Sequence, residues 1–376
     1  AEQTMTRRRG CVGALLVLLA LCVLASLVSI VSNRNLSIAP PAVDRLADVD
    51  KARLAEALHL RQALGNDIWP GFADTDIPVL LWNRETSFLV GVDQAPAGWQ
   101  PVPDDTFLGE PYFYQPTDNP QNFAVPVGDR LAASIATKSE TDAFLVEQFQ
   151  SMLPPVVKQV FPYSALIQPS EVQITAVLHE GFHVLQSQVA SAKLDAAEQI
   201  NRLEGDYWQA DEAQAGLWKE EVALLDQALK ARSLDETRNL ARQFIERRQA
   251  RRAAQQLPDG LIQFERLIEW EEGLAKYVEL ASWQLAGNTP EYTPLATLSA
   301  DPDFKDYSTF DSRWSQEMST MKRQVNEDGV TRFYYTGAAQ AFLLDKLAPG
   351  WQAQAMAPGV FLEDLLAAAA GADHAR

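Results

Sequence analysis

The distribution of hydrophobic and polar positions divides the chain into three parts. The first is an apolar run from Cys11 to Val31, which contains no charged residue over 21 positions and follows three arginines at 7–9. About 20 apolar residues are enough for a helix to cross a bilayer, and basic residues stay on the cytoplasmic side. We therefore expect a cytoplasmic tail at 1–10 and a transmembrane signal anchor at 11–32. The alternative is a signal peptide that is cleaved, which would release the protein by secretion.

The second part, after a polar linker at 33–43, predicts a leading helix and a small sheet. Apolar residues recur at helical spacing from 44 to 64, and Gly65 follows as a stop signal. Alternating and β-branched segments then predict strands that pair mainly antiparallel. These are a hairpin over 77–92, a short strand at 112–114, and a pair at 123–127 and 131–137. Residues 44–168 are thus interpreted as an N-terminal helix and sheet lobe.

Helical periodicity dominates the third part, which begins at about residue 139. Ser170 is expected to cap a helix, with Gln173 completing a capping box. The predicted helices are 171–192, a long charged stretch over 195–257, 261–285, 333–347 and 360–370, with a loop-rich segment at 288–330. The predicted fold class is α+β: an N-terminal membrane helix, the sheet lobe, and a mainly helical lobe at 169–376 that carries an insert at about 195–257.

Composition narrows the function classes. The 376 residues include 50 acidic and 32 basic ones, a net charge of −18, which argues against nucleic acid as a partner. The only cysteines are Cys11 and Cys22, so the body of the protein has neither a disulfide framework nor a cysteine-based zinc site. Because the apolar run would direct the body across a membrane, we expect it to be extracytoplasmic, either periplasmic or extracellular.

The sharpest chemical signal is the sequence His179-Glu180-Gly181-Phe182-His183. Two histidines four residues apart lie on one face of a helix, so both imidazoles can bind one metal ion. Glu180 is rotated away from them, in reach of a water molecule at that ion, where a general base is needed. The plainer interpretation is an amphipathic helix with two partly exposed histidines.

A catalytic zinc ion needs a third protein ligand. His59 lies in the first helix and His374 lies two residues from the C-terminus, so a carboxylate is the better candidate. Glu265, Glu269 and Glu272 share one face of the helix predicted over 261–285. Periodicity alone does not choose among the three.

The segments HEGFH and EEGLAKY together resemble the gluzincin zinc metallopeptidases, and the E-G-x-A-x-Y form is similar to that of bacterial collagenases. The resemblance implies one catalytic Zn²⁺ held by His179, His183 and Glu272, with Glu180 as the general base. It implies hydrolysis of a peptide or protein substrate. The small Gly273 beside the ligand leaves room for a neighbouring helix to approach closely.

The chain departs from the family pattern at two places. The gap between His183 and Glu272 is far longer than in thermolysin-like or aminopeptidase-like relatives, which implies a large helical insert. Lys276 stands where those relatives carry an acid that orients a zinc-binding histidine, which leaves Glu269 and Glu279 as candidates for that role. The resemblance also implies a tyrosine that donates a hydrogen bond to the oxyanion. Tyr335 fits this role, with Tyr334 as the alternative, and a packed aromatic pair is the plainer interpretation.

The sequence thus predicts a membrane-anchored, extracytoplasmic zinc metallopeptidase. Two other interpretations stay open: a zinc hydrolase of a non-peptide bond, and a catalytically idle, zinc-stabilised binding module at the membrane.

The insert contains a cluster of arginines interleaved with glutamates. We interpret this cluster as a solvated helix face rather than as a basic patch for an acidic partner. Its members are Arg238, Arg242, Arg247, Arg248, Arg251 and Arg252.

Overall fold

A computed structural model describes residues 23–371 except 35, 37, 212–214 and 328. The predicted cytoplasmic tail at 1–10 and most of the predicted anchor at 11–32 lie outside the described residues. Residues 23–34 are helical. Within the described part of the chain, no helix is both long enough and apolar enough to cross a membrane.

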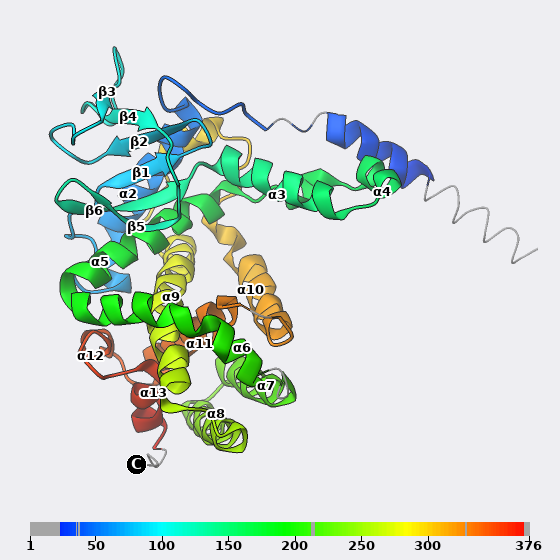
Figure 1. The fold of residues 1–376 in the computed structure, drawn as a ribbon, viewed down its shortest axis with the longest axis vertical. Helices are drawn as coiled ribbons and strands as arrows, with labels where there is room; N and C mark the ends of the chain where they lie inside the picture. The colour runs from blue at the N-terminus through cyan, green and yellow to red at the C-terminus, as the bar shows by residue number, and fades with distance from the viewer. Residues whose placement is uncertain (1–22, 35, 37, 212–214, 328, 372–376) are drawn as a thin grey trace, which may run out of the picture.

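The fold class is α+β, with one six-stranded sheet and many helices (Figure 1). The strand order is β3-β4-β2-β1-β6-β5, so β3 and β5 are the edges. Every pairing is antiparallel except that of β1 with β6, in which Leu80 lies opposite Ser134. The strands are β1 (Val79–Trp82), β2 (Thr86–Val90), β3 (Gln100–Pro101), β4 (Phe113–Pro116), β5 (Phe123–Val127) and β6 (Arg130–Ala136). The predicted hairpin and the predicted strand pair are confirmed.

Two long helices, α5 and α9, lie at the centre of the helical part. The helices before the insert are α2 (Asp48–Ile68), α3 (Lys138–Met152), α4 (Pro155–Val160) and α5 (Ser170–Ile200). The insert contains α6 (Glu204–Asp211), α7 (Ala215–Lys230) and α8 (Leu234–Gln255). The last group is α9 (Asp259–Asn288), α10 (Phe310–Gln324), α11 (Thr331–Leu347), α12 (Gln352–Ala355) and α13 (Leu362–Ala370).

Helix α5 is fixed against the sheet lobe by its apolar face. Ile174, Leu178 and Phe182 recur every fourth residue and are buried, as helical periodicity requires. The Phe182 ring packs edge-on against Trp69, with 4.8 Å between ring centroids, and against Phe72 at 5.9 Å. This packing turns the neighbouring face of α5, which carries the histidines, toward α9.

The predicted capping box at the start of α5 is wrong. Ser170 lies inside the helix, and its hydroxyl accepts a hydrogen bond from Arg53 Nε at 3.0 Å. Gln173 donates instead to the backbone oxygen of Ala136 at 2.6 Å. Both polar side chains that the local pattern assigns to a helix cap therefore form hydrogen bonds with residues distant in the sequence.

Some arginines of the insert are buried against the body in ion pairs, instead of facing solvent. Arg248 and Arg251 are both 1% exposed. Arg248 Nη2 lies 2.7 Å from Glu269 Oε1 on α9, and Arg251 Nη1 lies 2.7 Å from Glu265 Oε1. Burying an arginine needs such partners, because an unpaired charge in the interior is costly. The prediction of a solvated arginine face is thus wrong for these residues, although Arg238 is exposed.

Helix α10 falls in the segment that was predicted to be loop-rich, 288–330. Its apolar residues Phe310, Trp314, Met318 and Met321 do follow helical spacing. Eight polar or charged residues separate them, which weakens the signal along the sequence. The helix is stabilised by packing, for example of the Trp314 ring on Phe342 at 5.0 Å.

Residues 138–168 project from the body as an arm made of α3, α4 and a 3₁₀ turn, Tyr163–Leu166 (Figure 1). The helix of residues 23–34 lies beside the outer end of this arm. The sequence pattern did not predict this arm.

Candidate metal centre

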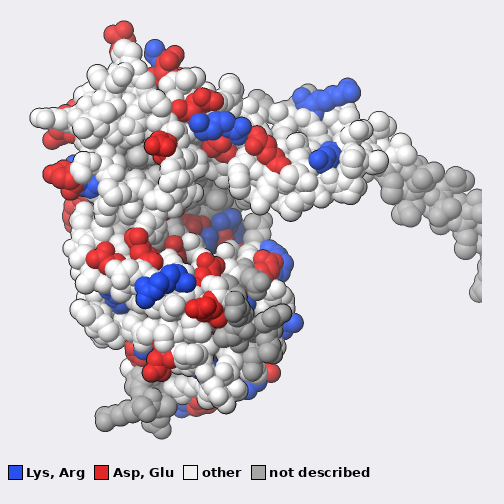
Figure 2. All heavy atoms as spheres, viewed as in Figure 1, with Lys and Arg blue, Asp and Glu red and all other residues white. Residues whose placement is uncertain are grey.

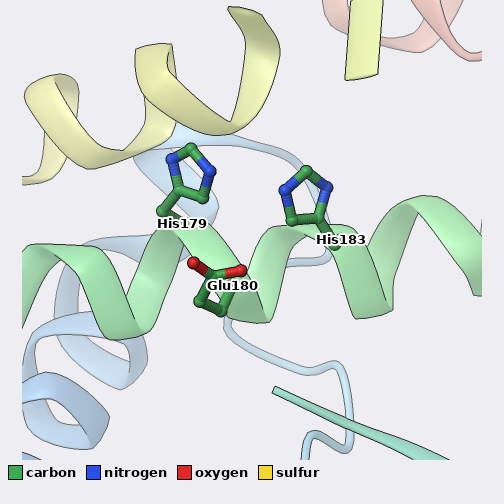
Figure 3. A group of neighbouring side chains, drawn as sticks. All are labelled: His179, Glu180 and His183. Atoms are coloured by element: carbon green, nitrogen blue, oxygen red, sulfur yellow. The ribbon is translucent and has the colours of Figure 1, made fainter. Parts of the chain in front are cut away.

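The two histidines of α5 face α9 side by side. His183 is fully buried and His179 is 7% exposed, with 5.1 Å between ring centroids. Figure 3 shows both imidazoles rising toward α9, with the Glu180 carboxylate beside them on the same turn. Potential ligand atoms of His179, Glu180 and His183 all lie within 4.8 Å of one another. The helix thus gathers the donors as the spacing predicted.

The structure brings only one of the three candidate glutamates to these imidazoles. Glu272 Oε2 lies 3.3 Å from His179 Nε2 and 3.5 Å from His183 Nε2. Glu265 and Glu269 are instead paired with arginines of the insert. Ligands bound about 2.0–2.1 Å from a tetrahedral ion are separated by roughly 3.4 Å. The two distances from the Glu272 oxygen to the imidazole nitrogens therefore fit one such ion.

The protonation pattern of His183 also fits a metal ligand. Gln186 Nε2 donates to the backbone oxygens of Trp270 and Glu271 at 3.0 and 3.2 Å, which turns its Oε1 toward His183 Nδ1 at 2.8 Å. An oxygen there accepts the Nδ1 hydrogen, and the neutral ring then has its lone pair on Nε2. That buried Nε2 has no hydrogen-bond partner among the described residues. Sequence reasoning missed Gln186, whose only signal is its place seven residues after His179.

Of the two candidates for the orienting acid, Glu279 is the one that lies beside His179. Its Oε2 lies 3.5 Å from His179 Nδ1, while Glu269 is turned away toward the insert. Lys276, which stands at the position expected to be acidic, binds Glu279 Oε1 at 2.7 Å and Glu317 at 3.2 Å. Glu279 follows Glu272 by two helical turns instead of one, so it remains on the same face of α9.

Loss of this acid is expected to weaken zinc binding. Glu279→Ala should lower the zinc affinity by about 10–100-fold, because an acid that orients a ligating histidine typically contributes that much. Competition with a chromophoric chelator measures the affinity, and thermal melting shows whether the variant is folded. Glu291→Ala, which removes an exposed acid, is the matched control. Equal zinc affinities in the two folded variants would show that Glu279 does not contribute to the site.

Two neighbouring tyrosines line the pocket above the donors, which has a volume of about 300 Å³. Tyr334 stacks on His179, with 5.9 Å between centroids and 16° between the planes. Tyr335 lies beside Lys276 instead, with 5.8 Å between its ring centroid and Lys276 Nζ. Burial and the negative charge of Glu272 raise the pKa of Tyr334, so its hydroxyl stays protonated and can donate a hydrogen bond at neutral pH.

The electrostatics of these side chains favour a general base at Glu180. Burial raises the pKa of Glu180 to about 7, although the two histidines oppose this shift. Burial would lower the pKa of His179, but its contacts with Glu272 and Glu279 outweigh this and raise it to about 10. Electrostatic attraction to His183 and a hydrogen bond with His179 hold the pKa of Glu272 well below its usual range, against the effect of burial. A metal ion would therefore replace a proton between His179 and Glu272.

Neither remaining histidine joins the site in the part of the chain that is described. His59 contacts the backbone oxygen of Thr293 and stacks on Tyr292. His374 lies outside the described residues.

No family model, curated protein or solved structure matches this chain.

Proposed function

We propose that the protein is a zinc-dependent metallopeptidase of the gluzincin type. The observation that carries the proposal is the position of Glu272 Oε2, within 3.3 and 3.5 Å of an Nε2 atom from each histidine of the HEGFH helix. This donor set, two imidazoles and one carboxylate, is that of catalytic zinc sites in thermolysin-like enzymes. The segment EEGLAKY, which supplies the carboxylate, is also the one on which the resemblance rests.

His179, His183 and Glu272 would hold the ion. When bound, zinc supplies Lewis-acid polarisation of the scissile carbonyl and lowers the pKa of a water molecule. Glu180 accepts the proton of the attacking water and delivers it to the leaving amine. The protonated hydroxyl of the half-buried Tyr334 donates a hydrogen bond to the carbonyl oxygen as negative charge develops there. We assign this contact to Tyr334 instead of Tyr335 because only the Tyr334 ring stacks on His179.

An edge strand beside the pocket suits an extended peptide. Strand β5 is paired on one side only, with β6. Its first residue, Phe123, lines the pocket and lies 4.5 Å from His183 between ring centroids. A peptide chain can add to such a free edge through backbone hydrogen bonds, with its scissile bond near the donors.

The proposed enzyme acts outside the cytoplasm. This location rests on the arginines at 7–9 and the apolar run from Cys11 to Val31. The segment would hold the catalytic part at the membrane as a signal anchor, or direct its secretion if it is cleaved.

Metal analysis tests the proposal directly. Wild-type protein should contain about one zinc ion per chain, whereas Glu272→Ala should lose it after dialysis against a weak chelator, because two imidazoles alone bind zinc far less tightly. Inductively coupled plasma mass spectrometry gives the zinc-to-protein ratio. His59→Ala is the matched control, since it removes a histidine outside the site. Zinc retained equally by Glu272→Ala and wild type would refute the assignment.

A further inference from the structure

The outer end of the arm exposes an unusual amount of apolar side chain. Met152 is 63% exposed and Val156 is 76% exposed, and Val157 is also open to solvent. The neighbouring helix of residues 23–34 exposes more than half of each of five side chains: Val23, Leu24, Leu27, Val28 and Val31. Contiguous apolar surface of this kind marks a site of interaction.

The two elements form one surface, because hydrogen bonds join them. Asn33 Nδ2 donates to the backbone oxygen of Phe161 at 2.7 Å, and the backbone N–H of Tyr163 donates to Asn33 Oδ1 at 3.1 Å. Ser32 Oγ lies 3.0 Å from Ser164 Oγ. Figure 1 shows the helix of 23–34 lying along the outer end of the arm. We call this combined surface, residues 23–34 and 148–161, the arm tip.

The charge of the arm tip is opposite to that of the whole protein. The chain is 22% charged and carries a net charge of −18, yet the arm tip contains no acidic residue. Its only charged side chains are Arg34 and Lys158. Figure 2 shows the outer part of the arm as white with basic groups, whereas acidic groups are spread over the body. Apolar side chains bordered by a few cations are typical of helices that lie in the membrane interface.

The position of the arm tip in the chain indicates what covers it. Residues 23–31 are the second part of the uncharged run that begins at Cys11, so the surface includes the end of the segment predicted to enter lipid. A second copy of the chain would bring the same two cations and no acid to this surface. Phospholipid head groups would instead offer phosphate to Arg34 and Lys158, with acyl chains below for the apolar side chains.

We propose that the arm tip binds the lipid bilayer. Met152, Val156 and Val157 enter the interfacial region beside the helix of 23–34, and Lys158 reaches the head groups. The arm then holds the body at a fixed orientation to the membrane. This inference concerns a surface outside the catalytic site and does not depend on the proposed peptidase activity.

A fluorescent label at the arm tip tests the proposal. The full chain with Cys11→Ser and Cys22→Ser would carry a single cysteine, Val156→Cys or Met152→Cys, labelled with an environment-sensitive dye. It would be reconstituted into phosphatidylcholine vesicles with and without nitroxide-labelled phosphatidylcholine. The matched control is Leu234→Cys, an apolar residue that is 51% exposed on α8. Circular dichroism of each labelled protein checks that it is folded.

We expect the dye at 156 and at 152 to shift to the blue in vesicles and to lose about half of its fluorescence to the lipid nitroxide, because interfacial side chains lie roughly 5–10 Å into the head-group region. The dye at 234 should show neither change. The proposal is overturned if positions 156 and 234 behave alike, or if the chain does not bind the vesicles. A blue shift at 156 that also occurs in detergent, without quenching by the lipid nitroxide, would assign the surface to a second copy and likewise overturn it.

Discussion

Glu180→Gln is expected to reduce peptide hydrolysis by about 10²–10⁴-fold while leaving zinc bound. The reduction follows because an amide cannot accept the proton of the attacking water, and positioned general bases contribute a factor of this size. Zinc should be retained because the amide keeps the shape of the side chain and the three proposed ligands are unchanged. Hydrolysis of a quenched fluorescent peptide library, together with the zinc-to-protein ratio of the same sample, measures both effects.

Three outcomes distinguish the competing interpretations. Activity lost with zinc retained supports the peptidase. Activity on esters or other acyl compounds but not on peptides, lost in the same variant, would favour a zinc hydrolase of a non-peptide bond. A wild-type protein that binds zinc and hydrolyses none of these substrates would favour the idle binding module. Glu291→Gln, an exposed substitution of the same type, is the matched control.

The pH dependence of kcat/KM gives a second test of Glu180 as the general base. The base must be ionised to act, so kcat/KM should rise with pH through the pKa of Glu180. Burial places that pKa at about 7 in the metal-free site, and a bound dication would lower it because it favours the carboxylate. The rising limb is therefore expected at or below pH 7, and the residual activity of Glu180→Gln should lack it.

Gly337→Ala is expected to destabilise the protein by about 3 kcal/mol or more, since overpacking against a rigid backbone has costs in this range. A Cβ atom at residue 337 would lie 2.4 Å from the backbone oxygen of Glu269 and 2.7 Å from Gly273 Cα. Both obstacles are backbone atoms, so α9 and α11 would have to separate. Urea denaturation gives the free energy of unfolding.

The control for this substitution is Gly205→Ala, in an exposed helical position with no atom within 4 Å of the added Cβ. It should be stabilising by about 0.5–1 kcal/mol, because alanine favours the helix. The same stability for both variants would show that α9 and α11 tolerate separation. If Gly337→Ala does fold, its activity should also fall, since α11 carries Tyr334 and α9 carries Glu272.

Local patterns predict the elements of this fold where one face of each element is buried. The hairpin of β1 and β2, the pair of β5 and β6, and the helix around His179 follow from periodicity alone. The prediction was wrong where distant partners decide. Ser170 bonds to Arg53 instead of capping its helix, and Arg248 is buried because Glu269 lies opposite it. Such partners lie far apart in the sequence, so no local pattern shows them.

In the candidate site, too, local spacing predicts some features and contacts between distant residues decide the others. The spacing of His179 and His183 places both imidazoles on one face, and the structure adds the long-range contacts. Periodicity left three glutamates open, and the crossing of α5 and α9 selects Glu272. The orientation of Tyr334 and Tyr335 depends on how α11 is rotated about its axis, which the contact between Gly273 and Gly337 fixes. The close approach of a helix at Gly273 is a long-range feature that the sequence predicted, and it is confirmed.

The whole insert separates the two imidazoles from Glu272, which follows His179 by 93 positions in the sequence. During synthesis, a nascent chain displays the histidine pair long before it contains the third donor. The Glu265 and Glu269 side chains that neutralise the buried arginines of α8 belong to the same helix as Glu272. Docking of that helix therefore completes the interior and the donor set in one step, so a partly made or partly folded chain carries an incomplete centre.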